Sequence, residues 1–132
     1  MKVLALDYGS ARTGVAVSDP TGTIARPLEV VERAASDAGL RRLAELVAAE
    51  EVERVVVGLP LTLRGERGAQ AEETERFVDA LRERVDVPVE SFDERFTTAL
   101  AGQGPPSGAA EDARAAAHLL SSYLSWQTAR AR

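Results

Sequence analysis

Acidic residues at three places far apart in the chain could form a catalytic site if the fold brought them together. Asp7 ends the apolar run VLALD, Asp93 and Glu94 end the run VPVESFDE, and Asp112 opens a long alanine-rich segment. Carboxylates that lie close together repel one another unless a cation lies between them. Hard divalent ions such as Mg²⁺ and Mn²⁺ prefer oxygen ligands. The acids therefore predict a site for Mg²⁺ or Mn²⁺, provided that one edge of the fold collects them.

The elements that must position these acids follow one another as β-β-β-α-β-α-β-α. Short apolar runs bounded by turn residues predict strands over 3–7, 14–18, 23–31, 52–58 and 87–94. Apolar residues at helical spacing predict helices over 35–51, 69–84 and 110–126, the first with Ser36 or Asp37 as its N-cap. Pro27 marks the third strand as an edge strand.

This order predicts an α/β fold in which residues 1–132 form a single domain. The first three strands form an antiparallel meander, and strands joined through a helix are parallel, with right-handed crossovers. The result is a mixed five-stranded sheet of order 3-2-1-4-5 with helices on both faces. Open α/β sheets place their ligands at the carboxyl ends of their parallel strands. Asp7 and the pair Asp93 and Glu94 would share that edge, and the last helix could fold back to bring Asp112 there.

The composition of the chain excludes several classes of protein. The chain is long enough to bury a real core, and the absence of cysteine excludes disulfides and thiolate metal sites. With 16 basic and 21 acidic residues, the net charge of −5 argues against a surface coated with nucleic-acid-binding charge. Any contact with nucleic acid must come from a local basic patch together with metal ions. No segment has the length of a membrane span and no signal-peptide pattern opens the chain, so we expect a cytoplasmic protein without membrane contact.

Four segments resemble the marker segments of the YqgF/RuvX family in order and spacing. They are LALDYGSARTGVAVSD, VVVGLPLTLRGE, FDERFTT and EDARAAAHLLSSYL, which together span nearly the whole chain. The resemblance implies a ribonuclease H-like fold, in agreement with the strand order above. It maps the acidic motif positions of the family onto Asp7, Glu94 and Asp112. Members are described as nucleases that process the 5′ end of pre-16S ribosomal RNA, and an older description is Holliday junction resolvase.

The resemblance implies metal-assisted hydrolysis of phosphodiester bonds in ribosome biogenesis. Asp7 would bridge two metal ions, with Glu94 and Asp112 each completing one, and such ions clamp the attacking and leaving oxygens of an in-line displacement. A phosphate or sugar could approach the backbone closely at a glycine. The guanidinium group of arginine can donate two parallel hydrogen bonds to a phosphate. The candidate contacts with nucleic acid are Gly9, Ser10, Arg12, Thr13, Arg64, Arg67 and Arg95.

The chain departs from the family pattern at two places. Arg64 and Gly65 stand where the loop after GLP often continues to an Asp-Gly pair. The segment before Asp112 is short, and no lysine or arginine lies between Arg95 and Arg114. With so small a basic patch, we expect binding of nucleic acid to be modest and sensitive to salt.

Other functions stay open at this point. Branched or single-stranded DNA is an alternative to a ribosomal RNA precursor, because both present the same phosphodiester, and a junction resolvase would act as a homodimer. The sequence does not indicate whether the protein is a monomer or a homodimer. The chain could instead be a non-catalytic RNA-binding factor of ribosomal precursor particles. An Asp-x-Gly strand end also opens the phosphate loop of actin-like ATPases and sugar kinases, but those enzymes use two such lobes and this chain supplies one.

Overall fold

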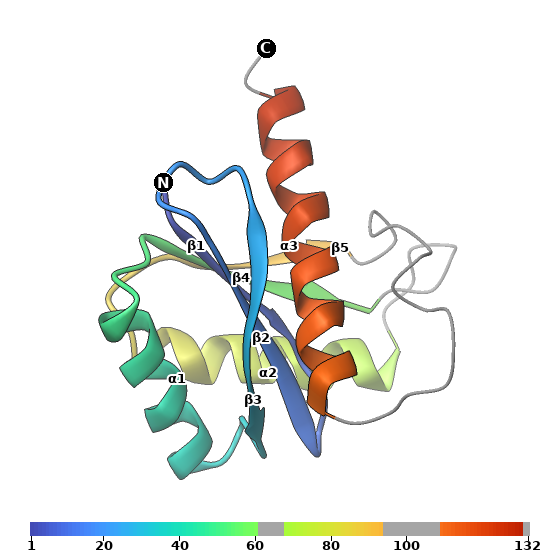
Figure 1. Cartoon of the computed structure of the whole chain (residues 1–132). Helices are drawn as coiled ribbons and strands as arrows, with labels where there is room; N and C mark the ends of the chain where they lie inside the picture. The colour runs from blue at the N-terminus through green and yellow to red at the C-terminus, as the bar shows by residue number, and fades with distance from the viewer. Residues whose placement is uncertain (61–67, 94–108, 131–132) are drawn as a thin grey trace.

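A mixed five-stranded sheet forms the centre of the molecule (Figure 1). The computed structural model describes residues 1–60, 68–93 and 109–130, apart from the side chains of residues 109 and 110. The sheet has the order β3-β2-β1-β4-β5, with antiparallel pairs β1–β2 and β2–β3 and parallel pairs β1–β4 and β4–β5. The predicted strand order is confirmed. The strands are β1 (Val3–Asp7), β2 (Arg12–Ser18), β3 (Ala25–Glu32), β4 (Arg54–Leu59) and β5 (Val89–Asp93).

Three helices cover the two faces of the sheet (Figure 1). The helices α1 (Asp37–Ala49) and α2 (Ala69–Arg82) lie on one face, and α3 (Ala109–Arg130) lies across the other. Successive side chains of a strand point to opposite faces. In β1, Leu4 and Leu6 enter the core beneath α1 and α2, whereas Val3 and Ala5 pack beneath α3. This alternation assigns each strand residue to one of the two faces.

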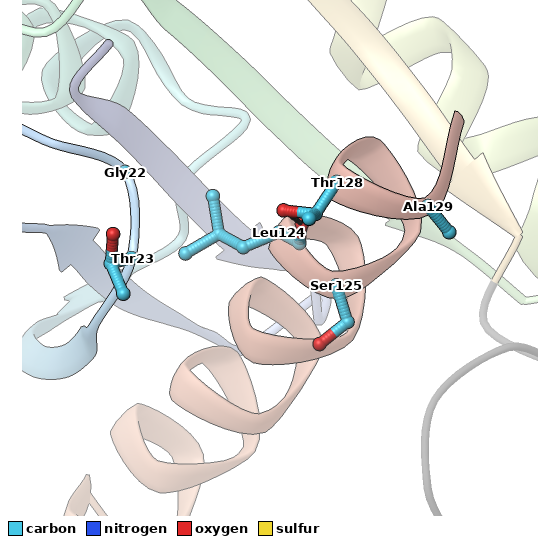
Figure 2. A pocket seen from close by; sticks show the side chains of 6 residues that line it. All are labelled: Gly22, Thr23, Leu124, Ser125, Thr128 and Ala129. Carbon is cyan, nitrogen blue, oxygen red and sulfur yellow. Dashed lines mark hydrogen bonds between the residues drawn. The ribbon is translucent and has the colours of Figure 1, made fainter. Parts of the chain in front are cut away.

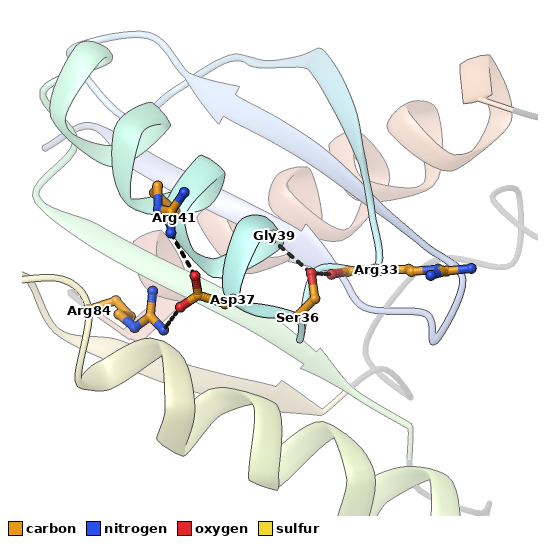
Figure 3. Close-up of polar contacts among 6 residues, drawn as sticks. All are labelled: Arg33, Ser36, Asp37, Gly39, Arg41 and Arg84. Atoms are coloured by element: carbon orange, nitrogen blue, oxygen red, sulfur yellow. Dashed lines mark hydrogen bonds and ion pairs between the residues drawn. The ribbon is translucent and has the colours of Figure 1, made fainter.

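The start of α1 has an N-cap and is hydrogen-bonded to a residue just past the end of α2 (Figure 3). Ser36 is the N-cap, and its hydroxyl oxygen accepts a hydrogen bond of 3.0 Å from the backbone N–H of Gly39. Asp37 accepts hydrogen bonds from Arg41 (2.6 Å), one turn later in α1, and from Arg84 (2.5 Å), just past α2. The hydrogen bond from Arg84 is the main cause that lowers the pKa of Asp37. The two helices therefore share a polar link outside the core.

The strand and helix boundaries fall within two residues of the prediction, with one exception. The helix α3 continues to Arg130, beyond the predicted end at Trp126. The guanidinium of Arg130 lies 4.5 Å from the centre of the Trp126 ring, which is a cation–π contact that supports the extra turn. The earlier start of β2 at Arg12 moves Arg12 and Thr13 from the turn into the strand. Within the described ranges, no helix is both long and apolar enough for a membrane span.

Candidate active site

Asp7 lies at the carboxyl end of β1, on the face that α3 covers. Its side chain follows the alternation of β1, in which Val3 and Ala5 also point toward α3. Asp7 is partly exposed, whereas the four residues before it are buried. The strand therefore places one carboxylate on the rim of an otherwise apolar face, as predicted from the sequence.

Gly14 links Asp7 to the first turn of α3. It is the register partner of Asp7 in the antiparallel pair β1–β2, and such partners lie about 4.5–5.5 Å apart. A Cβ atom placed on Gly14 would lie 1.8 Å from the backbone oxygen of Asp112. The first turn of α3 thus rests directly on the backbone of β2. Asp7 and Asp112 consequently share one edge and one face of the sheet, one strand apart.

Sequence reasoning missed Gly14 as a residue of the site. It took Gly14 only as the first residue of the strand GVAVS. A glycine inside an apolar strand often marks a place where another backbone approaches closely, and that signal could have found the contact. The contact fixes where Asp112 stands, because a side chain larger than hydrogen would collide with the helix backbone.

Arg12 brings a positive charge to Asp112. Its Nε lies 2.9 Å from Oδ2 of Asp112, and the two side chains are 43% and 29% exposed. Oδ2 itself is buried, and none of the described donors reaches it in regular hydrogen-bond geometry. The contact is therefore an ion pair without a directed hydrogen bond. The neighbouring acid, Glu111, pairs instead with Arg114 on its own helix.

The third predicted acid, Glu94, lies outside the described residues. The sequence alone left Asp93 and Glu94 as alternatives. Val89 packs beneath α2 and Phe92 packs beneath α3, so the alternation of β5 places Asp93 on the face opposite to Asp7. Asp93 therefore does not join the acids on the α3 face. Among the described residues, which do not include Glu94, no three acidic, histidine or cysteine side chains form a group that could hold a metal ion.

Two predicted substrate contacts, Gly9 and Thr13, have structural roles in the turn between β1 and β2. A Cβ atom on Gly9 would lie 2.5 Å from the backbone oxygen of Arg12, so glycine is needed to close the turn. Thr13 is completely buried. Its hydroxyl donates a hydrogen bond of 3.4 Å to the carbonyl oxygen of Gly9. Its side chain is thus enclosed and stabilises the turn, and contact of Thr13 with nucleic acid stays a prediction.

Glu73 of α2 holds the same turn from the other face. It accepts hydrogen bonds from the hydroxyls of Tyr8 (2.8 Å) and Ser10 (2.7 Å). Tyr8 also stacks on Phe77, with ring centres 4.4 Å apart. Burial, followed by the hydrogen bond to Glu73, raises the pKa of Tyr8 to about 12. The hydrogen bonds from Ser10 and Tyr8 lower the pKa of Glu73. Ser10, a predicted substrate contact, is exposed at the site but already has a protein partner.

Three of the predicted arginines also lie outside the described residues. They are Arg64, Arg67 and Arg95. Together with Glu94 they stay predictions from the sequence. The described part of the candidate site consists of two acids, the arginine beside one of them and the turn that follows β1.

A surface pocket of about 350 Å³ lies elsewhere, between the turn from β2 to β3 and the C-terminal part of α3 (Figure 2). At a rise of about 1.5 Å per residue, Leu124 in its wall stands about 18 Å along α3 from Asp112. Its lining carries no charged side chain and consists of Gly22, Thr23, Leu124, Ser125, Thr128 and Ala129. The pocket is therefore separate from the acidic edge.

Comparison with known proteins assigns the chain to a family. Residues 1–126 match the family model described as "RuvX: Holliday junction resolvase". The chain belongs to the RuvX family. The matched range includes the whole RuvX sheet and the part of α3 that carries Asp112.

Curated RuvX relatives match over most of this chain. A protein of Chloroflexus aurantiacus named "Putative pre-16S rRNA nuclease" is 48% identical over 101 residues, which are 76% of this chain and 66% of the relative. A protein of Chloroflexus aggregans with the same name is 50% identical over 101 residues, 76% of this chain and 71% of the relative. The match thus spans about two thirds of the length of these relatives.

The RuvX chain also resembles a solved structure. The structure of Thermus thermophilus RuvC in complex with a Holliday junction substrate has a TM-score of 0.62 and 20% sequence identity, with 97% of this chain and 96% of that chain covered. At this identity the likeness shows the fold alone. Together with the sheet order, it identifies the fold as ribonuclease H-like, as the sequence predicts.

Proposed function

We propose that this RuvX protein is a metal-dependent nuclease that hydrolyses phosphodiester bonds. The observation that carries the proposal is the placement of Asp7 and Asp112 on one face and one edge of the sheet, one strand apart. Glu94 is the third acid of the proposed site, because it follows the last residue of β5 in the sequence. The carboxyl edge of parallel strands is also where open α/β sheets bind their ligands.

The donors on this edge fit a hard divalent cation. They are carboxylate oxygens, which Mg²⁺ and Mn²⁺ prefer. Oδ2 of Asp112 is buried without a regular hydrogen bond from the described residues, so it keeps acceptor capacity for an ion. Asp7, Glu94 and Asp112 would hold the metal. When bound, it would neutralise charge on the phosphate and lower the pKa of a bound water.

The residues around the acids would orient the nucleic acid. The turn 8–11 presents Ser10 beside the carboxyl end of β1, and Glu73 holds that turn in place. Arg12 is exposed and lies next to Asp112, so it can reach a phosphate at the same edge. We include Arg64, Arg67 and Arg95 as phosphate contacts on sequence grounds.

The substrate proposed first is the 5′ end of a pre-16S ribosomal RNA. The names of the Chloroflexus relatives support it. The family description and the RuvC complex with a Holliday junction favour a four-way DNA junction as the second candidate. The proposed setting is the cytoplasm, on ribosomal precursor particles, as a monomer or homodimer.

The test is a cleavage assay on parallel substrates. End-labelled single-stranded RNA with a pre-16S 5′ sequence, single-stranded DNA and a four-way junction are each incubated with Mg²⁺, with Mn²⁺ or with chelator. We expect metal-dependent cleavage of the RNA that is absent for Asp7→Asn, which removes one charge and keeps the volume. Selective cutting of the junction would favour the DNA alternative. RNA binding without cleavage, unchanged in Asp7→Asn, would replace the proposal with a non-catalytic RNA-binding role.

A further inference from the structure

The ion pair between Arg12 and Asp112 places the permanent positive charge of a guanidinium where the proposed site needs a metal ion. We infer that Arg12 is an exchangeable counter-cation: it neutralises Asp112 before the metal binds and moves to a phosphate of the nucleic acid afterwards. The inference rests on the proposed function, because it requires a divalent ion at Asp112.

The two partners of the ion pair differ in their freedom to move. Asp112 belongs to the first turn of α3, whose backbone lies against Gly14, and the next residue, Ala113, is buried. Arg12 is the first residue of β2, and its side chain is 43% exposed on a long, flexible stem. Any separation of the pair therefore has to come from Arg12 moving away from Asp112.

The geometry of the pair is that of a replaceable contact. Strong arginine–carboxylate pairs are bidentate, and the chain contains one between Arg42 and Glu29, with hydrogen bonds of 2.9 and 2.7 Å. The pair of Arg12 and Asp112 instead joins Nε to Oδ2 at 2.9 Å without regular hydrogen-bond geometry. The Arg12 side chain is 43% exposed and makes no bidentate contact, so solvent and salt weaken its hold on Asp112. A divalent ion can therefore compete with the guanidinium.

Electrostatics couples the two binding events. A guanidinium and a divalent ion at the same carboxylate oxygen repel each other, so metal binding at Asp112 favours the departure of Arg12. A side chain that reaches Oδ2 also reaches a phosphate oxygen placed next to that atom, and arginine binds phosphate well. Loss of Arg12 should therefore strengthen metal binding and weaken nucleic-acid binding. A purely structural role would not move the two affinities in opposite directions.

The test compares Arg12→Gln with Arg114→Gln as a matched control. Both variants remove one positive charge near the start of α3, but Arg114 pairs with Glu111 rather than Asp112. Mn²⁺ affinity is measured from the paramagnetic resonance signal of free Mn²⁺, and RNA affinity from fluorescence anisotropy of a short single-stranded RNA in Ca²⁺. We expect Arg12→Gln to bind Mn²⁺ about fivefold more tightly than the wild type, as the loss of a competing exposed ion pair implies, and to bind RNA more weakly. The control should stay within about twofold for Mn²⁺, because it leaves Asp112 paired.

Two further results separate this inference from the proposed function. Arg12→Lys keeps the charge and should retain wild-type Mn²⁺ affinity, which also checks that the effect does not come from lost packing. If Arg12→Gln and Arg114→Gln shift Mn²⁺ affinity equally, the exchange is wrong while the metal site stands. If the wild type itself takes up no Mn²⁺, the metal site fails, and the inference fails with it.

Discussion

The two central strands, β1 and β2, present larger side chains to one face of the sheet than to the other. Beneath α1 and α2 the core consists of large residues, with Leu4, Leu6, Leu43, Phe77 and Leu81 nearly or fully buried. Beneath α3 the same strands contribute the small residues Ala5, Gly14 and Ala16, although large side chains such as Phe92 and Tyr123 are also buried there. Small residues let a helix approach a sheet until backbones touch. Both faces therefore contribute hydrophobic burial, and the face beneath α3 also fixes the position of a helix end through the contact at Gly14.

This difference explains why the candidate site lies where it does. An acid positioned by side-chain packing would shift as the core repacks. Asp112 is instead positioned by backbone contact between α3 and Gly14, opposite Asp7. Mutations on the two faces should therefore separate stability from activity.

The largest expected effect is on the acids of the α3 face. We expect Asp112→Asn to lower cleavage about a hundredfold or more, because even residues that only support a metal ligand cost about 10- to 100-fold when lost. The adjacent variant Glu111→Gln should stay near wild type, since Glu111 pairs with Arg114 on the helix surface. Initial rates at saturating Mn²⁺ make the comparison. Equal losses in the two variants would show that charge at the helix end matters rather than the position of Asp112.

On the opposite face, the effect should be on stability alone. Leu43 of α1 is fully buried in the large-residue core. We expect Leu43→Ala to lower the free energy of unfolding by about 2–5 kcal/mol, measured by chemical denaturation. Cleavage per folded molecule should not change at temperatures where the variant is fully folded. A marked loss of activity in that folded variant would mean that the α1 face also positions the acids.

Gly14→Ala tests the backbone contact between β2 and the first turn of α3. The added methyl group collides with the backbone of Asp112, and overpacking of this kind costs about 1–3 kcal/mol. We expect cleavage to fall about tenfold or more, because small displacements of catalytic groups reduce rates strongly. Rates are measured on folded protein, with denaturation curves alongside.

Gly68→Ala is the matched control for this substitution. A Cβ atom on Gly68 would meet no atom of the described residues within 4 Å, so that variant should cleave at the wild-type rate. A Gly14→Ala protein that is destabilised but cleaves normally once folded would contradict the positioning role.

Most of the fold could be predicted from the sequence because its signals are local. Short apolar runs, turn residues and helical spacing fixed the element order, and crossover rules then gave the sheet order. The rim position of Asp7 followed from the same rules. The contact of Gly14 with Asp112 could not be derived, because it depends on how closely α3 packs. The enclosure of Thr13 depends likewise on the shape of one turn, which spacing alone does not reveal.

The smallest expected effect concerns Glu73, which holds the turn after β1 from the large-residue face. In Glu73→Gln the negative charge beside Tyr8 is lost, so the pKa of Tyr8 should fall below about 12. It should stay above its usual value near 10, because burial, the largest cause of the raised pKa, remains. Ultraviolet absorbance of the phenolate against pH measures this shift. Tyr8→Phe assigns the signal, because burial also raises the pKa of Tyr123.

The effect of Glu73 on stability has a definite sign. Its pKa is lowered in the folded state by the hydrogen bonds from Ser10 and Tyr8. It therefore stabilises the fold at pH values above its unfolded pKa, and this contribution disappears as the pH falls through the folded pKa. The free energy of unfolding of Glu73→Gln should therefore fall less than that of the wild type as the pH is lowered. Because the turn is also closed by Gly9 and Thr13, cleavage should fall far less than in Gly14→Ala. A loss as large as that of Gly14→Ala would mean that the α2 face positions the site as strictly as the α3 face does.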